Sequence, residues 1–190
     1  MGSLTIRLAT AADAAALAAL YAPYVTSTPV SFETEPPDAA EMRERLAAGG
    51  ALYPWLVAEE GGTLLGFASA SRFRPRHAYR FTVETSVYLD SSAHGQGLGR
   101  LLYGRLLDGL TAQGFTQAIA AISLPNEASV ALHERLGFAP AGTYRNVGFK
   151  FDAWHSVGLW QKELARTAPH PEEPKPYDAI GLDRILTGPA

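Results

Sequence analysis

The segment His94-Gly95-Gln96-Gly97-Leu98-Gly99-Arg100 has the composition of a phosphate-binding turn. It stands between a strand-like and a helix-like segment, and such a junction exposes unpaired backbone N–H groups at the positive end of a helix dipole. Glycines let the backbone approach a diphosphate closely. A Walker loop is excluded because Gly99 is followed by Arg100-Leu101 instead of Lys-Ser/Thr. The dinucleotide fingerprint is excluded because this G-x-G-x-G comes late in the chain. The alternative is an ordinary tight turn.

Two titratable residues suit proton transfer. Glu84 lies in the strand-like segment 82–89, which carries no other charge. A carboxylate there is costly unless it meets water, a cation or a substrate amine. His133 lies in a helix-like segment, and its ordinary pKa is close to neutral pH. The alternatives are an ion pair between Glu84 and a nearby arginine, and a surface position for His133.

Four arginines stand among aromatic residues within nine positions, residues 72–80. Arginine binds carboxylates and phosphinates through two parallel hydrogen bonds, so this segment could clamp an anionic substrate. A solvated charged loop is the alternative. A nucleic-acid surface is disfavoured because the segment is short and the chain carries a net charge of -3.

Composition limits the remaining possibilities. The 190 residues, 47% hydrophobic and 18% charged, suit one globular domain. The chain has no cysteine, which excludes disulfides, iron–sulfur clusters and a cysteine nucleophile and fits a reducing compartment. The five histidines show no metal-ligand spacing, so we expect no metal. Neither a signal peptide nor a membrane-spanning run is visible, and we expect a cytoplasmic protein without a membrane partner.

Hydrophobic periodicity predicts the elements that position these residues. The class is α/β (α+β), a central mixed sheet flanked by helices on both faces, without the strict alternation of a doubly wound fold. We assign residues 1–165 to one domain and 166–190 to a proline-rich tail, either disordered or lying along a partner. The expected strands are 4–8, 54–59, 63–71, 82–90, 117–123, 138–144 and 149–162. The first expected helix begins at Thr10 or Asp13 and ends near Tyr21, and the other three cover 38–48, 97–112 and 126–136.

These features together resemble the GNAT superfamily of N-acetyltransferases. The glycine turn is similar to the acyl-CoA loop of that superfamily, with His94 where Gln or Arg is usual. Similarity to the phosphinothricin and methionine sulfoximine acetyltransferase branch extends over about residues 5–163. It is carried by Val30-Ser31-Phe32, Thr34-Glu35-Pro36, Tyr53-Pro54-Trp55-Leu56-Val57-Ala58-Glu59, Thr82-Val83-Glu84, Leu124-Pro125-Asn126 and Trp154-His155.

The resemblance implies the GNAT acyl-CoA N-acyltransferase fold, with acetyl-CoA as cosubstrate and direct transfer to an amine. It makes Glu84 the general base and places His133 at a position where many members have a proton-donating tyrosine. Tyr103 is the alternative proton donor, or a packing residue. A bulged strand is expected to present the backbone of Val87, Tyr88 and Leu89 to the pantetheine arm, with the Leu89 N–H as oxyanion donor. The implied cofactor-binding residues are Val87, Tyr88, Leu89, His94, Gly95, Gln96, Gly97, Leu98, Gly99, Arg100 and Asn126, the last also an N-cap.

The resemblance also implies the substrate. Arg74, Arg76 and Tyr79 would contact a small amino acid with a second anionic or tetrahedral group, such as phosphinothricin or methionine sulfoximine, and Phe32 would form an apolar wall. Members of the branch are commonly homodimers. The alternatives are acetylation of another small amine, a protein N-terminus or a polyamine, and a non-catalytic acyl-CoA sensor. A polyamine would be repelled by the arginines.

Overall fold

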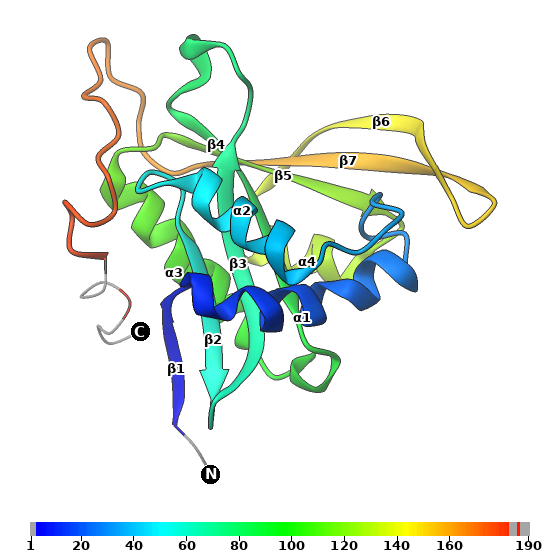
Figure 1. The fold of residues 1–190 in the computed structure, drawn as a ribbon. Coiled ribbons are helices and arrows are strands. Elements are labelled where there is room, and N and C mark those ends of the chain that lie inside the picture. The colour runs from blue at the N-terminus through cyan, green and yellow to red at the C-terminus, as the bar shows by residue number, and fades with distance from the viewer. Residues whose placement is uncertain (1–2, 183–185, 187–190) are drawn as a thin grey trace.

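The computed structural model describes residues 3–182 and 186, and within them a seven-stranded sheet forms the centre of the molecule (Figure 1). The strand order is β1-β2-β3-β4-β5-β7-β6. Only β4 and β5 run parallel, and all other neighbours are antiparallel. The strands are β1 (Leu4–Leu8), β2 (Trp55–Glu60), β3 (Thr63–Arg72), β4 (Thr82–Leu89), β5 (Gln117–Leu124), β6 (Ala139–Lys150) and β7 (Ala153–Glu163).

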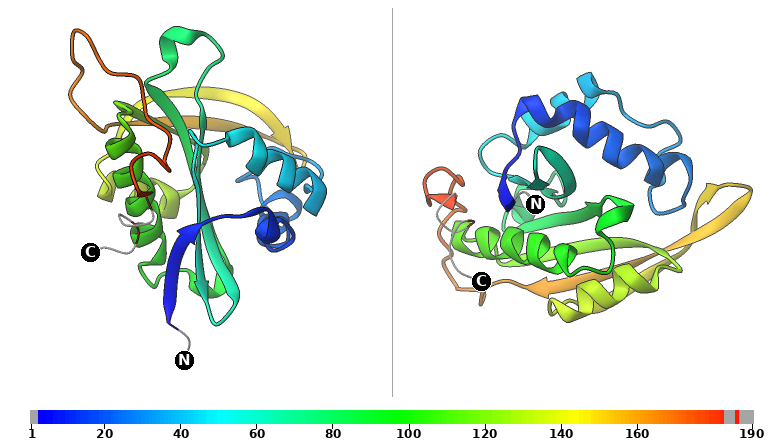
Figure 2. Two further views of the ribbon diagram at one scale, coloured as in Figure 1. Left: turned by 60° about the vertical axis from the view of Figure 1, so that its left-hand side comes forward. Right: turned by 90° about the horizontal axis from the view of Figure 1, so that it is seen from below.

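Helices cover both faces of this sheet, as Figure 2 shows from below. The helices are α1 (Ala14–Thr26), α2 (Ala39–Gly49), α3 (Leu98–Gln113) and α4 (Glu127–Arg135). One core forms between the sheet and α1 and α2, and a larger core forms between the sheet and α3. The expected mixed sheet with helices on both faces is therefore confirmed. None of the described helices is long and apolar enough to cross a membrane.

Local sequence signals explain most helix ends. The Asp38 side chain accepts hydrogen bonds from the backbone N–H groups of Ala40 and Glu41 and so begins α2. Gly97 and Gly114, both with left-handed backbone, bound α3. Helix α1 runs five residues beyond its expected end near Tyr21, through Pro23 to Thr26. Val25 is buried against the sheet in this last turn, so tertiary packing outweighs the helix-breaking tendency of Pro23.

The β6–β7 hairpin is longer than the sequence indicated. The gap expected at 145–148 is an irregularity within β6, between Tyr144 and Gly148, and the strand continues to Lys150. The chain reverses at Phe151 and Asp152, which both have positive φ, as the two-residue turn of a hairpin requires. The sequence did not indicate this turn because it contains no glycine and Phe151 is unusual at positive φ, although Asp152 is a common residue there.

The described part of the expected tail folds back on its own domain. Leu182 is 2% exposed and lies against Gly109 of α3, where a Cβ would stand 2.6 Å from Leu182 Cδ1. Gln113 donates from Nε2 to the carbonyl oxygen of Lys175 at 2.9 Å, and the Lys175 N–H donates to the Gln113 carbonyl oxygen at 2.7 Å. Residues 183–185 and 187–190 of this segment lie outside the described residues.

Candidate active site

The parallel strands β4 and β5 separate halfway along their length. Residues 82–84 pair with 117–119, whereas the remainder of each strand pairs only with its other neighbour. A small hollow of about 40 Å³ lies at this fork. Its lining includes Val30 from the loop between α1 and α2, residues 85–88 and 121–123 from the two strands, and His133 from α4. Residues from the α1–α2 loop, from both strands and from α4 therefore meet around this hollow.

Glu84 stands at the last paired position before the fork. Side chains alternate along β4, and because Thr85 faces α3, Glu84 points toward the face covered by α1 and α2. Burial raises the pKa of this carboxyl group, and the charge of Arg74 lowers it in part. Among the described residues the carboxylate has no hydrogen-bond or ion-pair partner. A half-buried, unpaired carboxylate is a suitable acceptor for a substrate proton.

His133 is not a surface histidine, because its exposed fraction is 4%. Its Nδ1 lies 2.7 Å from the carbonyl oxygen of Ser129. Since a carbonyl can only accept, Nδ1 carries the proton and Nε2 of the neutral ring is an acceptor. Burial lowers the pKa of His133, while the hydrogen bond to Ser129 raises it. This arrangement suits proton acceptance better than proton donation to a thiolate.

Tyr103 occupies a packing position. Its hydroxyl lies 2.7 Å from Thr85 Oγ1, and its ring stacks on Phe138 and meets the edge of His133. The side chain is fully buried, and burial raises the pKa of the phenol. The structure thus favours the packing alternative for this residue.

The glycine turn has left-handed backbone at two of its glycines. Gly95 and Gly97 have φ angles of 74° and 82°, which a side-chain-bearing residue rarely adopts. Gly97 directly precedes α3, whose first N–H groups have no partner within the helix. Gln96 donates from Nε2 to the Ser92 carbonyl oxygen, and Arg100 is exposed beside the turn. The residues present therefore fit the diphosphate of a coenzyme.

The expected bulge in β4 is wrong. Strand β4 pairs with β3 in unbroken register from Arg72↔Val83 to Gly66↔Leu89. Its free backbone groups arise instead from the departure of β5, which leaves one edge unpaired after Glu84. Several of the expected contact residues are already engaged. The Leu89 N–H lies 3.4 Å and His94 Nε2 lies 3.2 Å from Tyr24 Oη, and Asn126 Oδ1 accepts from the Ser129 N–H as the N-cap of α4.

The arginines of residues 72–80 have different partners. Arg80 forms an ion pair with Glu173 of the tail segment at 2.8 Å. Arg74 and Arg76 are exposed and form no ion pair with a described residue. Tyr79 is also exposed and meets the ring of Phe73 edge-on. Arg74 and Arg76 are therefore accessible to an anion, whereas Arg80 has a structural partner.

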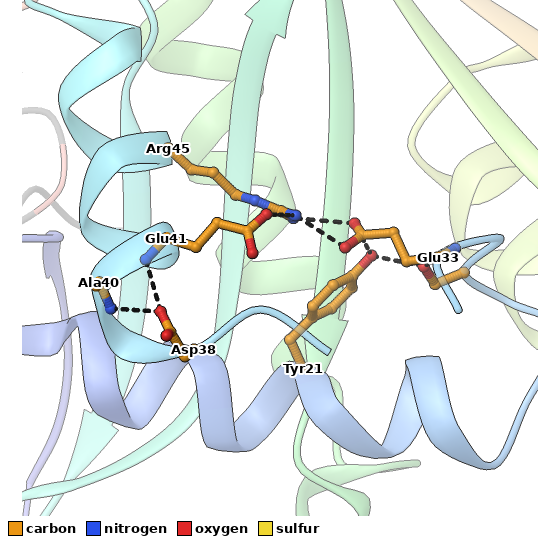
Figure 3. Close-up of polar contacts among 7 residues, drawn as sticks. Tyr21, Glu33, Asp38, Ala40, Glu41 and Arg45 are labelled. Carbon is orange, nitrogen blue, oxygen red and sulfur yellow. Dashed lines mark hydrogen bonds and ion pairs between the residues drawn. The ribbon is translucent and has the colours of Figure 1, made fainter. Parts of the chain in front are cut away.

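The sequence did not single out the residues that hold the loop between α1 and α2. Figure 3 shows that the Glu33 carboxylate accepts two hydrogen bonds from Arg45 and one from the Tyr21 hydroxyl. Arg45 holds the pKa of Glu33 below its usual range. Lys150 Nζ donates to the Ser31 carbonyl oxygen of the same loop. These partners lie between 12 and 119 residues from the loop, so no local pattern marks them.

No group of three or more His, Cys, Asp or Glu side chains within the described residues could hold a metal ion. The site consists of a forked sheet, a glycine turn before α3, a half-buried carboxylate and a buried histidine.

Comparisons with known proteins agree with this geometry. Residues 17–138 match the model of the acetyltransferase (GNAT) family. The phosphinothricin N-acetyltransferase of Streptomyces viridochromogenes is 43% identical over 92% of this chain and 95% of its own. The L-methionine sulfoximine/L-methionine sulfone acetyltransferase of Salmonella typhimurium is 36% identical over 85% and 95%. The crystal structure of a phosphinothricin acetyltransferase from Sinorhizobium meliloti in complex with acetyl-CoA superposes with a TM-score of 0.85 at 40% identity, covering 90% of this chain and 94% of that one.

The mixed sheet that splits between β4 and β5, together with this site, defines an acyltransferase. The chain belongs to the GNAT family of acetyltransferases. The family resemblance and the expected enzyme class, an N-acetyltransferase, are confirmed.

Proposed function

We propose that this protein transfers the acetyl group of acetyl-CoA to the α-amine of a small amino acid that carries a second anionic or tetrahedral group. Phosphinothricin and methionine sulfoximine are the leading substrates. One observation carries the proposal: the unpaired Glu84 carboxylate stands at the fork on the side of the accessible Arg74, while the diphosphate turn lies at the far end of the same strand. The names of the relatives support the substrate class.

Different residues of this chain bind the coenzyme, bind the amino acid and accept the proton. Acetyl-CoA supplies the acetyl group as a thioester. Residues 94–100 and the N-terminus of α3 hold its diphosphate, and the unpaired edge of β4 after Glu84 offers backbone groups to its arm. Arg74 and Arg76 bind the acid groups of the amino acid, with Tyr79 and Phe32 beside them.

Glu84 accepts the amine proton, the amine nitrogen forms the new C–N bond with the acetyl carbon, and the C–S bond of the thioester breaks to release coenzyme A as a thiolate that takes its proton from water. Direct transfer is the simplest route because the chain has no cysteine to form an acyl-enzyme. His133 accepts a hydrogen bond at Nε2 and so orients a ligand in the hollow or takes up a proton. A role of the Leu89 N–H as oxyanion donor requires that it leave Tyr24 Oη, a weak contact at 3.4 Å.

A thiol-release assay tests the proposed function. The protein is incubated with acetyl-CoA and with phosphinothricin, methionine sulfoximine, methionine sulfone or spermidine. We expect turnover of the first three and none of spermidine. Arg74→Ala should raise the KM for these amino acids by about tenfold or more, with the KM for acetyl-CoA unchanged. Tight coenzyme binding without turnover of any amine would identify a non-catalytic sensor instead.

We also propose a homodimer in the cytoplasm. The β6–β7 hairpin exposes large apolar side chains, each between 49% and 63% accessible: Tyr144, Val147, Phe149, Phe151 and Trp154. Such a concentration is typical of protein interfaces. The lack of cysteine fits a reducing compartment. Light scattering of the purified protein measures the mass, and a monomer at micromolar concentration would contradict the dimer.

A further inference from the structure

Lys150 is a buried lysine outside the proposed chemistry. It is the last residue of β6, and its exposed fraction is 7%. Its Nζ donates to the carbonyl oxygen of Val25 at 2.6 Å and to that of Ser31 at 2.7 Å. Burying an ammonium group is costly unless acceptors replace its water, so the two carbonyl groups stabilise it in this position.

The two carbonyl groups belong to the two ends of a short segment. Val25 lies in the last turn of α1, where carbonyl groups lack helical partners and the helix dipole favours a cation. Ser31 lies in the loop between α1 and α2, and its Oγ bonds the Tyr21 hydroxyl. One ammonium group thus bridges the end of the helix and the loop that carries Val30 and Phe32.

The same hairpin supports the loop at a second point. Phe32 packs over Gly148, where an added Cβ would overlap the phenylalanine ring. The His155 ring lies beside Phe32 at 6.1 Å between centroids, and its Nε2 contacts the Lys150 carbonyl oxygen at 2.9 Å. Figure 2 shows the hairpin curving toward the C-terminal end of α1. Lys150 is therefore part of a continuous contact between hairpin and loop.

We propose that Lys150 is a positioning residue that fixes the acceptor side of the hollow by holding residues 25–32 against the β6–β7 hairpin. Val30 lines the hollow, and the loop reaches it from the face on which Glu84 lies. Among the described residues, no hydrogen bond or ion pair joins Lys150 to residues 94–100. The inference rests on the proposed function in assigning Phe32 to the amine substrate, but the structural link between lysine and loop stands without it.

The test compares Lys150→Met, which keeps the side-chain length and removes the donors, with Lys162→Met. Lys162 lies on the neighbouring strand of the same hairpin, and its side chain makes no hydrogen bond with a described residue. Amide hydrogen exchange of the full-length protein should become about tenfold faster in residues 26–33 of Lys150→Met and stay unchanged in Lys162→Met. The KM for the amine should rise about tenfold with the KM for acetyl-CoA within twofold.

Unchanged exchange in residues 26–33, or an equal rise of both KM values, would overturn the proposal. If the wild-type enzyme acetylates none of the amino acids, the proposed function fails, and the exchange measurement still decides the role of Lys150. If Lys150→Met does not fold, Gly148→Ala displaces Phe32 from the hairpin and should produce the same selective loss. Lys150→Arg, which retains donors, should recover part of the exchange protection.

Discussion

Replacing Glu84 by Gln is expected to change activity and stability in opposite directions. The substitution keeps the size of the side chain and removes only the charge. Glu84 has no described ion-pair or hydrogen-bond partner, so no native bond is broken. The variant therefore isolates the consequence of placing a carboxylate at the fork.

The size of the catalytic effect follows from the assigned role. General-base catalysis contributes about 10²- to 10⁴-fold to a rate. At about 1.4 kcal/mol for each factor of ten, the substitution should raise the activation free energy of turnover by about 3 to 5.5 kcal/mol. We expect kcat for the amino acid to fall at least about a hundredfold, with the KM for acetyl-CoA little changed, because the coenzyme turn lies at the other end of β4.

The stability effect depends on pH in a defined direction. Burial raises the pKa of Glu84 above its ordinary value of 4.5. A group whose pKa is raised by folding stabilises the protein below the unfolded pKa, and this contribution is lost as pH rises through the folded pKa. At neutral pH the charged form is disfavoured, so Glu84→Gln should melt at a higher temperature than the wild type. The difference should shrink as pH falls toward 4.

The assays are thiol release at saturating acetyl-CoA and thermal unfolding between pH 4 and pH 8. Glu44→Gln, an exposed carboxylate on α2, serves as the control and should change neither quantity. Near-wild-type turnover in Glu84→Gln would remove Glu84 from the role of general base. A lower melting temperature at neutral pH would mean that the carboxylate has a stabilising partner.

Two further predictions concern the coenzyme turn and the tail segment. Gly97→Ala should raise the KM for acetyl-CoA without changing the KM for the amine, because a side chain at a φ of 82° strains the turn by about 1 kcal/mol; equal effects on both substrates would contradict this assignment of the turn. Leu182→Ala should lower the free energy of unfolding by about 2–5 kcal/mol, since the side chain is buried against Gly109 of α3. Denaturant unfolding measures this loss, and a change below about 0.5 kcal/mol would show that the tail segment does not belong to the folded core.

Local patterns predicted most elements because their signals lie within a few residues of one another. The apolar stripe of α3 follows the helical period, and the Asp38 cap and the glycines at 97 and 137 act through backbone geometry near their own positions. The same holds for the uncharged surroundings of Glu84, which drew attention to that residue. The continuation of α1 through Pro23 was missed because the burial of Val25, a tertiary contact, decides it.

The amino-acid sequence by itself thus determined the order of the elements, the glycine turn and the types of residue available for proton transfer. Only the tertiary structure decided that β4 and β5 part after Glu84, that His133 is buried with its Nδ1 proton held by Ser129, and that Lys150 holds a loop 119 positions away. The physical reason is that a buried polar group must find partners wherever the packed chain brings them, and burial is a property of the whole fold.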